Sequence, residues 1–191
     1  MRRPLLTFFS LTYAVTWICW AAAGAISRWT VPSDPALAAL ASVVFLLGTI
    51  TPALVAVALA KRAGGVAAAG ALLGHVFEWR VRARWYAFAI GFMPAIKLSV
   101  AVVHRVATGA WPRFGPEAWY IMAAAIVVST WLQAGEEIGW RGYALPRMAE
   151  RFGLPNASVI LGILWASWHL PLFSCRQATR MDNRFPCTCS R

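Results

Sequence analysis

The sequence predicts an all-α protein, a polytopic bundle of about five membrane-spanning helices. Three observations predict this fold class. Of the 191 residues, 60% are hydrophobic and only 13% are charged, whereas charged residues make up about 25% of an average soluble domain. The hydrophobic residues form continuous runs, each close to the ~20 residues that cross a bilayer. The basic residues flank these runs and form no single stripe, which favours membrane topology over binding to nucleic acid.

The apolar runs define the expected elements in chain order. They are Leu5–Ile26, Ala36–Ala60, Trp85–Ala107, Ala118–Ala134 and Pro155–Phe173. The first run could be a cleaved signal peptide, but it is longer than the roughly 7–15 residues of a signal h-region, so we expect an uncleaved helix. One membrane domain over residues 1–175 fits the length. Residues 176–191 are polar, and we expect them to form a disordered tail.

The distribution of the net charge of +11 predicts the orientation in the membrane. Placing the N-terminus in the cytoplasm puts most basic residues that flank the runs on that side, as the positive-inside rule requires. The loop Lys61–Arg84 then lies along the cytoplasmic interface. Lys97 and His104 interrupt the third run on one helical face, and we expect them to line the bundle interior or to reach the interface. The predicted location is a multi-pass protein of the cell membrane.

Two adjacent carboxylates end the fourth run. The charged forms of Glu136 and Glu137 are energetically unfavourable beside a membrane, because a charge at the bilayer centre costs about 3 kcal/mol and somewhat less near a helix end. Arg141 follows Glu137 by four residues, so the two side chains share a helical face and are expected to pair. Glu136 points about 100° away from that pair on an α-helix. The pattern leaves Glu136 available as a general base.

A histidine ends the fifth run. His169 follows Trp165 by four residues on the same helical face, and a lone histidine in such a helix is more often a hydrogen-bonding residue than a catalyst. Pro171 removes the backbone donor that would bond to the Ser167 carbonyl. We therefore expect a bend here, which would bring His169 within hydrogen-bond or one-water reach of Glu136.

These two clusters resemble the CPBP family, which contains the CAAX prenyl proteases and the bacteriocin-processing enzymes. Glu136, Glu137 and Arg141 match the family's E-E-x-x-x-R motif. His169 matches the histidine of its F-x-x-x-H motif, with Trp165 at the position where phenylalanine is usual. The resemblance covers about residues 120–173, and the earlier segments agree with the family only in being membrane helices.

The resemblance implies an intramembrane endopeptidase of prokaryotic type, acting near the cytoplasmic face on a peptide or protein that can carry a lipid. Glu136 and His169 would activate the attacking water, while Glu137, Arg141 and Trp165 would support them. No cofactor is expected. A metal mechanism has been argued for the family, so a divalent metal stays open as an alternative. The sequence contains no H-E-x-x-H zinc motif, and we assign no metal ligands. Membrane lipids are expected partners, and nucleic acid is not.

The family also has a third motif, H-x-x-x-N or H-x-x-x-D, that supplies polar groups for the oxyanion. None of the three histidines follows His169, so we expect a C-terminally incomplete family member with impaired activity. Two other interpretations remain open. One is a peptide-binding or immunity protein of the same family without catalysis. The other is a small transporter subunit that uses Lys97, His104 and the glutamates as a polar pathway.

Overall fold

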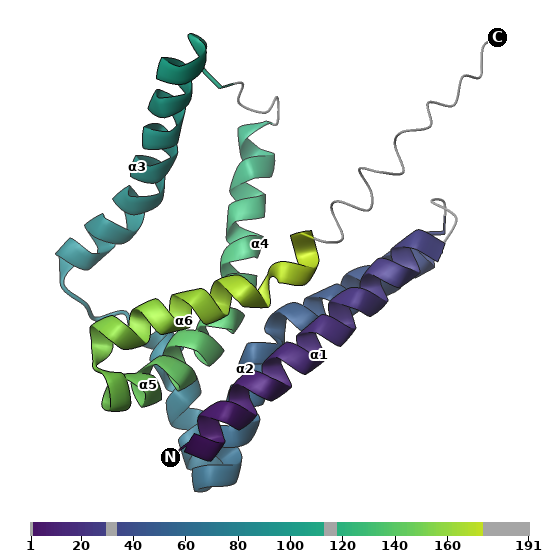
Figure 1. Ribbon diagram of the computed structural model, residues 1–191, viewed down its shortest axis with the longest axis vertical. Helices are drawn as coiled ribbons and strands as arrows, with labels where there is room; N and C mark the ends of the chain where they lie inside the picture. The colour runs from purple at the N-terminus through teal and green to yellow at the C-terminus, as the bar shows by residue number, and fades with distance from the viewer. Residues whose placement is uncertain (1, 30–33, 113–117, 174–191) are drawn as a thin grey trace. The chain divides into compact units, whose positions relative to one another are not determined.

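The computed structural model describes residues 2–29, 34–112 and 118–173, and every regular element in these ranges is a helix (Figure 1). The prediction of an all-α protein is therefore confirmed. The elements are α1 (Arg2–Trp29), α2 (Pro35–Gly74), the 3₁₀-helix η1 (His75–Phe77), α3 (Ala83–Thr108), α4 (Trp119–Glu137), the π-helix η2 (Ile138–Ala144), α5 (Leu145–Phe152) and α6 (Leu154–Trp168).

The chain forms two compact units. One comprises Met1–His75 together with Thr130–Arg191, and the other comprises Val76–Ser129. The residues of the two sequence motifs all belong to the first unit, so the candidate site is built within one body. The single domain expected over residues 1–175 stays a prediction, and the tail expected at 176–191 lies outside the described residues.

Four helices in the described ranges are long and apolar enough to cross a membrane. They are Pro4–Ser27, Pro35–Phe77, Ala83–Thr108 and Leu154–Phe173. These helices correspond to the first, second, third and fifth expected runs. The remaining run, Ala118–Ala134, lies in α4 but is not among the four, because α4 continues through the polar residues Gln133, Glu136 and Glu137.

The segment expected to be a loop after Ala60 is helical as far as Gly74, so the prediction was wrong for this part. The alanine-rich sequence after residue 65 favours a helix. The backbone leaves helical geometry only at Gly64 and Gly65, where Gly65 has a φ of 68°. Glycine adopts this left-handed conformation without a steric penalty, so the chain turns there and α2 resumes.

Helices α1 and α2 lie side by side (Figure 1), and two residues of α2 explain how closely they approach. A Cβ at Gly48 would lie only 2.9 Å from Cys19 Cβ and from Trp20 Cδ1, so the contact requires glycine. Pro52 has no N–H, which leaves the Gly48 carbonyl without its helical donor. The buried Thr16 hydroxyl of α1 donates to that carbonyl at 2.9 Å.

An aromatic core joins α1 to η2 and α6. Trp140 of η2 packs against Phe8 of α1 with ring centroids 5.6 Å apart. It packs against Trp168 of α6 at the same separation, and Trp168 contacts Trp20 of α1 at 4.7 Å. All four side chains are buried. Because such pairs add about 0.5–1.5 kcal/mol each beyond the burial of area, this core fixes the two motif-bearing elements against α1.

Candidate active site

Glu136 lies one residue before the end of α4, where its carboxylate meets α6. The indole N–H of Trp165 donates a long hydrogen bond to Glu136 Oε2, with Nε1 and Oε2 3.4 Å apart. The Glu136 side chain is half-buried and that of Trp165 is 44% exposed. The carboxylate is therefore partly shielded from solvent and is held by a donor from another helix.

His169 is held by the same tryptophan. Its ring atom Nδ1 lies 2.9 Å from the Trp165 carbonyl oxygen, and the two rings pack edge to face with centroids 4.5 Å apart. A carbonyl can only accept a hydrogen bond, so Nδ1 carries the hydrogen. In the neutral imidazole this leaves a lone pair on Nε2.

Trp165 thus brings the two residues of the proposed water site to one place. Its side chain bonds to Glu136 and its backbone carbonyl bonds to His169. Across the described residues, no direct hydrogen bond or ion pair joins Glu136 to His169. The expectation that a single water lies between them stays a prediction.

The titration of Glu136 reflects this environment. Glu136 lies beyond the expected run 118–134 and outside the four apolar helices. Burial raises the pKa of its carboxyl above the usual range, the Trp165 hydrogen bond and the charge of His169 lower the pKa, and the neighbouring Glu137 raises it. Burial is the largest of these effects, because it penalises the charged form. A raised pKa suits a carboxylate that must accept a proton from water.

The predicted ion pair between Glu137 and Arg141 is confirmed. Arg141 Nη1 contacts Glu137 Oε2, and the two side chains are 69% and 41% exposed, respectively. The ion pair joins the last residue of α4 to a residue of η2. Since Glu137 is occupied by Arg141, the second carboxylate is structurally paired and the first remains beside Trp165.

The sequence pattern did not predict the π-helix that follows the glutamates. The Leu145 N–H bonds to the Trp140 carbonyl five residues earlier, as in a π-turn, and π-turns are frequent at functional sites. Within η2, Gly139 faces the backbone of α2, and a Cβ at this position would lie only 2.5 Å from the Pro52 carbonyl oxygen. The motif glycine therefore allows the wide helix to lie directly on α2.

The expected bend at the end of α6 is present. The α-helix stops at Trp168, and the Leu172 N–H bonds to the His169 carbonyl instead of to Trp168. The indole N–H of Trp17 donates to the freed Trp168 carbonyl at 2.9 Å. Tyr13, one turn earlier on α1, bonds to the Leu164 carbonyl. No motif of the sequence pointed to these two α1 residues, although their spacing of four places them on one helical face.

Lys97 and His104 are the residues that interrupt the third expected run. They lie on α3, in the unit Val76–Ser129. His104 Nδ1 bonds to the Ala110 carbonyl at 3.0 Å, just after the end of its own helix, and the Lys97 side chain is exposed.

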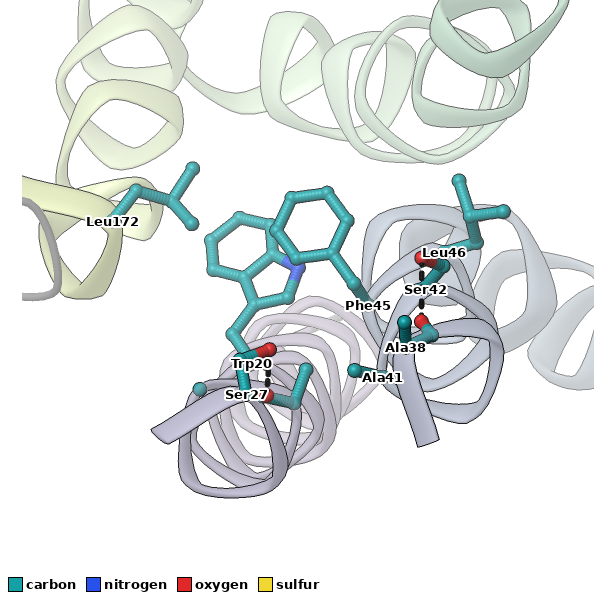
Figure 2. Close-up of a pocket in the computed structure, with 10 residues that line it drawn as sticks. Trp20, Ser27, Ala38, Ala41, Ser42, Phe45, Leu46 and Leu172 are labelled. Carbon is teal, nitrogen blue, oxygen red and sulfur yellow. Dashed lines mark hydrogen bonds between the residues drawn. The ribbon is translucent and has the colours of Figure 1, made fainter. Parts of the chain in front are cut away.

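An apolar cavity of about 620 Å³ lies between α1 and α2 (Figure 2). Trp20 and Phe45 stack at its wall, and Leu172 reaches it from the chain that follows α6. The hydroxyls of Ser27 and Ser42 donate to carbonyls of their own helices, so they present no unmet polar group to the cavity. Trp20 also approaches the His169 ring, with centroids 6.1 Å apart.

The described residues do not form a cluster of side chains that could bind a metal. Within residues 2–29, 34–112 and 118–173, no three side chains of histidine, cysteine, aspartate or glutamate gather at one place.

Comparison with known proteins adds three findings. Residues 115–186 match the family described as type II CAAX prenyl endopeptidase Rce1-like. Over 37 residues the chain is 51% identical to the CAAX prenyl protease 2 of Methanococcus maripaludis, a match that covers 19% of this chain and 14% of the relative. No solved structure matches the chain. The matched family segment contains both motifs, and the predicted resemblance is confirmed. Residues 115–186 of the chain are therefore similar to the Rce1-like family of CAAX prenyl endopeptidases.

Proposed function

We propose that this chain is a membrane endopeptidase in which Glu136 and His169 activate a water molecule that attacks a peptide bond. The observation that carries the proposal is the double contact of Trp165, which bonds to the Glu136 carboxylate and to His169 Nδ1. A carboxylate and an imidazole held by one residue can bind the same small molecule between them. The match of residues 115–186 to the Rce1-like family supports hydrolysis of a peptide as the chemistry.

The proposed step uses only groups in this cluster and the substrates. A water molecule donates one hydrogen bond to Glu136 and one to His169 Nε2. As the water oxygen bonds to the peptide carbonyl carbon, its proton passes to Glu136. The tetrahedral intermediate then breaks its C–N bond, and Glu136 returns the proton to the leaving nitrogen. General-base catalysis of this kind contributes about 10²–10⁴-fold in rate.

The supporting residues hold this arrangement. Glu137 and Arg141 neutralise one another, so Glu136 does not face an unpaired second carboxylate. No donor for the oxyanion is identified among the described residues. Since each missing donor lowers a rate by about 10²–10³-fold, we expect slow cleavage by this chain.

A lipid-bearing peptide is the substrate class that we propose. The M. maripaludis relative is a prenyl protease by name. The apolar cavity beside Trp20 supports an apolar group on the substrate, because its volume lies within the roughly 300–1,000 Å³ of pockets that enclose small molecules.

The test is cleavage of a reporter peptide by the purified 191-residue chain in liposomes, with and without a prenyl group on the peptide. We expect slow cleavage that Glu136→Gln and His169→Ala each reduce at least 100-fold. Glu150→Gln, an exposed carboxylate on α5, is the matched control and should leave the rate unchanged. Cleavage that survives Glu136→Gln would refute the proposed base. Peptide binding without any cleavage would favour the non-catalytic binding protein.

We also propose that the N-terminus and the glutamates face the cytoplasm. The test uses single cysteines at the exposed positions Ala36 and Arg62, near opposite ends of the apolar part of α2, in a chain whose native cysteines are replaced by serine. A membrane-impermeant thiol reagent should label Ala36→Cys in intact cells and Arg62→Cys only after permeabilisation. The reverse pattern would overturn this orientation.

A further inference from the structure

The indole of Trp17 in α1 bonds to the backbone directly before His169. Its N–H donates to the Trp168 carbonyl, with Nε1 and the carbonyl oxygen 2.9 Å apart. The α-helix ends at Trp168, and the Leu172 N–H bonds to the His169 carbonyl instead of to Trp168. Trp168 is fully buried, where an unpaired carbonyl is costly. The Trp17 N–H therefore supplies the partner that the interrupted helix lacks.

Tyr13 lies one turn before Trp17 and makes a second bond to α6, directly before Trp165. Its hydroxyl donates to the Leu164 carbonyl, and the hydroxyl oxygen lies 2.7 Å from Ser167 Oγ. The rings of Tyr13 and Trp17 pack together with centroids 5.4 Å apart. Residues four apart share a helical face, so both donors point from one face of α1 to one segment of α6.

The two contacts lie at either end of the segment that holds the proposed water site. Trp165 follows the first bonded carbonyl, and His169 follows the second. Trp165 bonds to Glu136 through its side chain and to His169 Nδ1 through its carbonyl. The last carbonyls of a helix have no helical donors, so the final turn depends on partners from elsewhere. Trp17 provides one such partner and Tyr13 holds the preceding turn, so α1 fixes the backbone from which the His169 ring projects.

We propose that Trp17 and Tyr13 are positioning residues of the water site. They hold the last turn of α6, so that His169 Nδ1 keeps its hydrogen bond to the Trp165 carbonyl and Nε2 stays aimed at the water beside Glu136. The inference rests on the proposed function and gives α1 a role in it. Both side chains act through the backbone of α6. Because a displacement of about 1 Å at a reacting group can lower a rate by about 10²-fold, loss of these bonds should lower kcat more than it changes KM.

The kinetic arm measures kcat and KM for the prenylated reporter peptide with the 191-residue chain in liposomes. Trp17→Phe should lower kcat by about 10²-fold and Tyr13→Phe by about tenfold, with KM changed less than about threefold. A third variant replaces the Trp17 indole by benzothiophene, in which sulfur takes the place of the N–H. It keeps the shape of the ring and should lose as much kcat as Trp17→Phe. Tyr86→Phe is the matched control, because it removes a hydroxyl that donates to the Trp79 carbonyl in the unit Val76–Ser129, and its kcat should be unchanged.

A spectroscopic arm observes His169 without turnover. The ¹⁵N shifts of the imidazole nitrogens are recorded in nanodiscs at alkaline pH, where an imidazole is neutral, and His169→Ala identifies the His169 signals. In the parent chain Nδ1 should carry the hydrogen and Nε2 should not. The three α1 variants should move both signals toward the average of the two tautomers, whereas Tyr86→Phe should not.

The two arms separate this inference from the proposed function. A loss of kcat together with averaged His169 signals supports the positioning role. If no chain cleaves the peptide, the proposed function falls, and averaged signals alone still support a role for α1 in holding His169. Signals that no α1 variant alters refute the inference, even where kcat falls together with Tm, because that loss reflects stability alone. Unchanged kcat in all three α1 variants of an active chain also refutes it and leaves the proposed function standing. Where Trp17→Phe does not fold, Tyr13→Phe and the benzothiophene variant decide.

Discussion

Replacing Gly139 by alanine should separate η2 from α2. The added Cβ would lie 2.5 Å from the Pro52 carbonyl oxygen and 2.6 Å from the Pro52 carbonyl carbon. Both are backbone atoms, so neither can rotate away as a flexible side chain could. The strain must be relieved by moving η2, which begins directly after Glu136 and Glu137.

The expected cost follows from this geometry. Overpacking of a close contact costs typically about 1–3 kcal/mol, and each kcal/mol corresponds to about 2–4 °C in Tm for a chain of 150–250 residues. Gly139→Ala should therefore lower Tm by roughly 2–12 °C. A shift of about 1 Å at the glutamates should lower the cleavage rate by about 10²-fold.

The assay compares thermal unfolding in detergent with Gly135→Ala, one helical turn earlier. A Cβ at Gly135 would make only an ordinary contact, 3.6 Å from Ile50 Cγ2. We expect this control to be neutral or slightly stabilising, because alanine is the better helix former. Equal Tm values for the two variants would show that η2 does not depend on its contact with Pro52, and would refute the reasoning.

Three further predictions concern the neighbouring contacts. Arg141→Ala should lower the free energy of unfolding by only about 0.2–1 kcal/mol in chemical denaturation, because the ion pair that it breaks is largely exposed; a loss above 3 kcal/mol would contradict this. Trp165→Phe removes the hydrogen bond that lowers the pKa of Glu136. The acid limb of the pH–rate profile, where the base becomes protonated, should therefore move to higher pH. An acid limb at the same pH would show that the Trp165 indole does not influence the base. Thr16→Val leaves the Gly48 carbonyl of α2 without a donor and should lower the free energy of unfolding by about 1–3 kcal/mol. Thr49→Val removes an exposed hydroxyl that bonds within its own helix, and it should lower the free energy of unfolding by less.

The sequence alone was sufficient for the fold class, the family resemblance and the local ion pair. Runs of apolar residues predict membrane helices because their length matches the bilayer, and four of the five appear as helices of sufficient length and hydropathy. The spacing of Glu137 and Arg141 predicts their contact because residues four apart are neighbours on a helix. The missing donor of Pro171 likewise predicts the interruption of α6 at His169. These are effects of local geometry, which the order of residues determines directly.

The tertiary structure alone decided how the two motifs meet. Glu136 and Trp165 are 29 residues apart in the chain, and no periodicity connects them. Their hydrogen bond exists because α5 turns the chain back and because the aromatic core on α1 fixes η2 and α6. The roles of Thr16, Tyr13 and Trp17 were equally out of reach from the sequence. Thr16 and Trp17 each satisfy a carbonyl that another helix leaves free, and Tyr13 bonds to the Leu164 carbonyl of α6. The local order of residues determines which segments are helical. A carbonyl that its own helix leaves free, however, accepts a hydrogen bond from another helix only when the two helices are packed together.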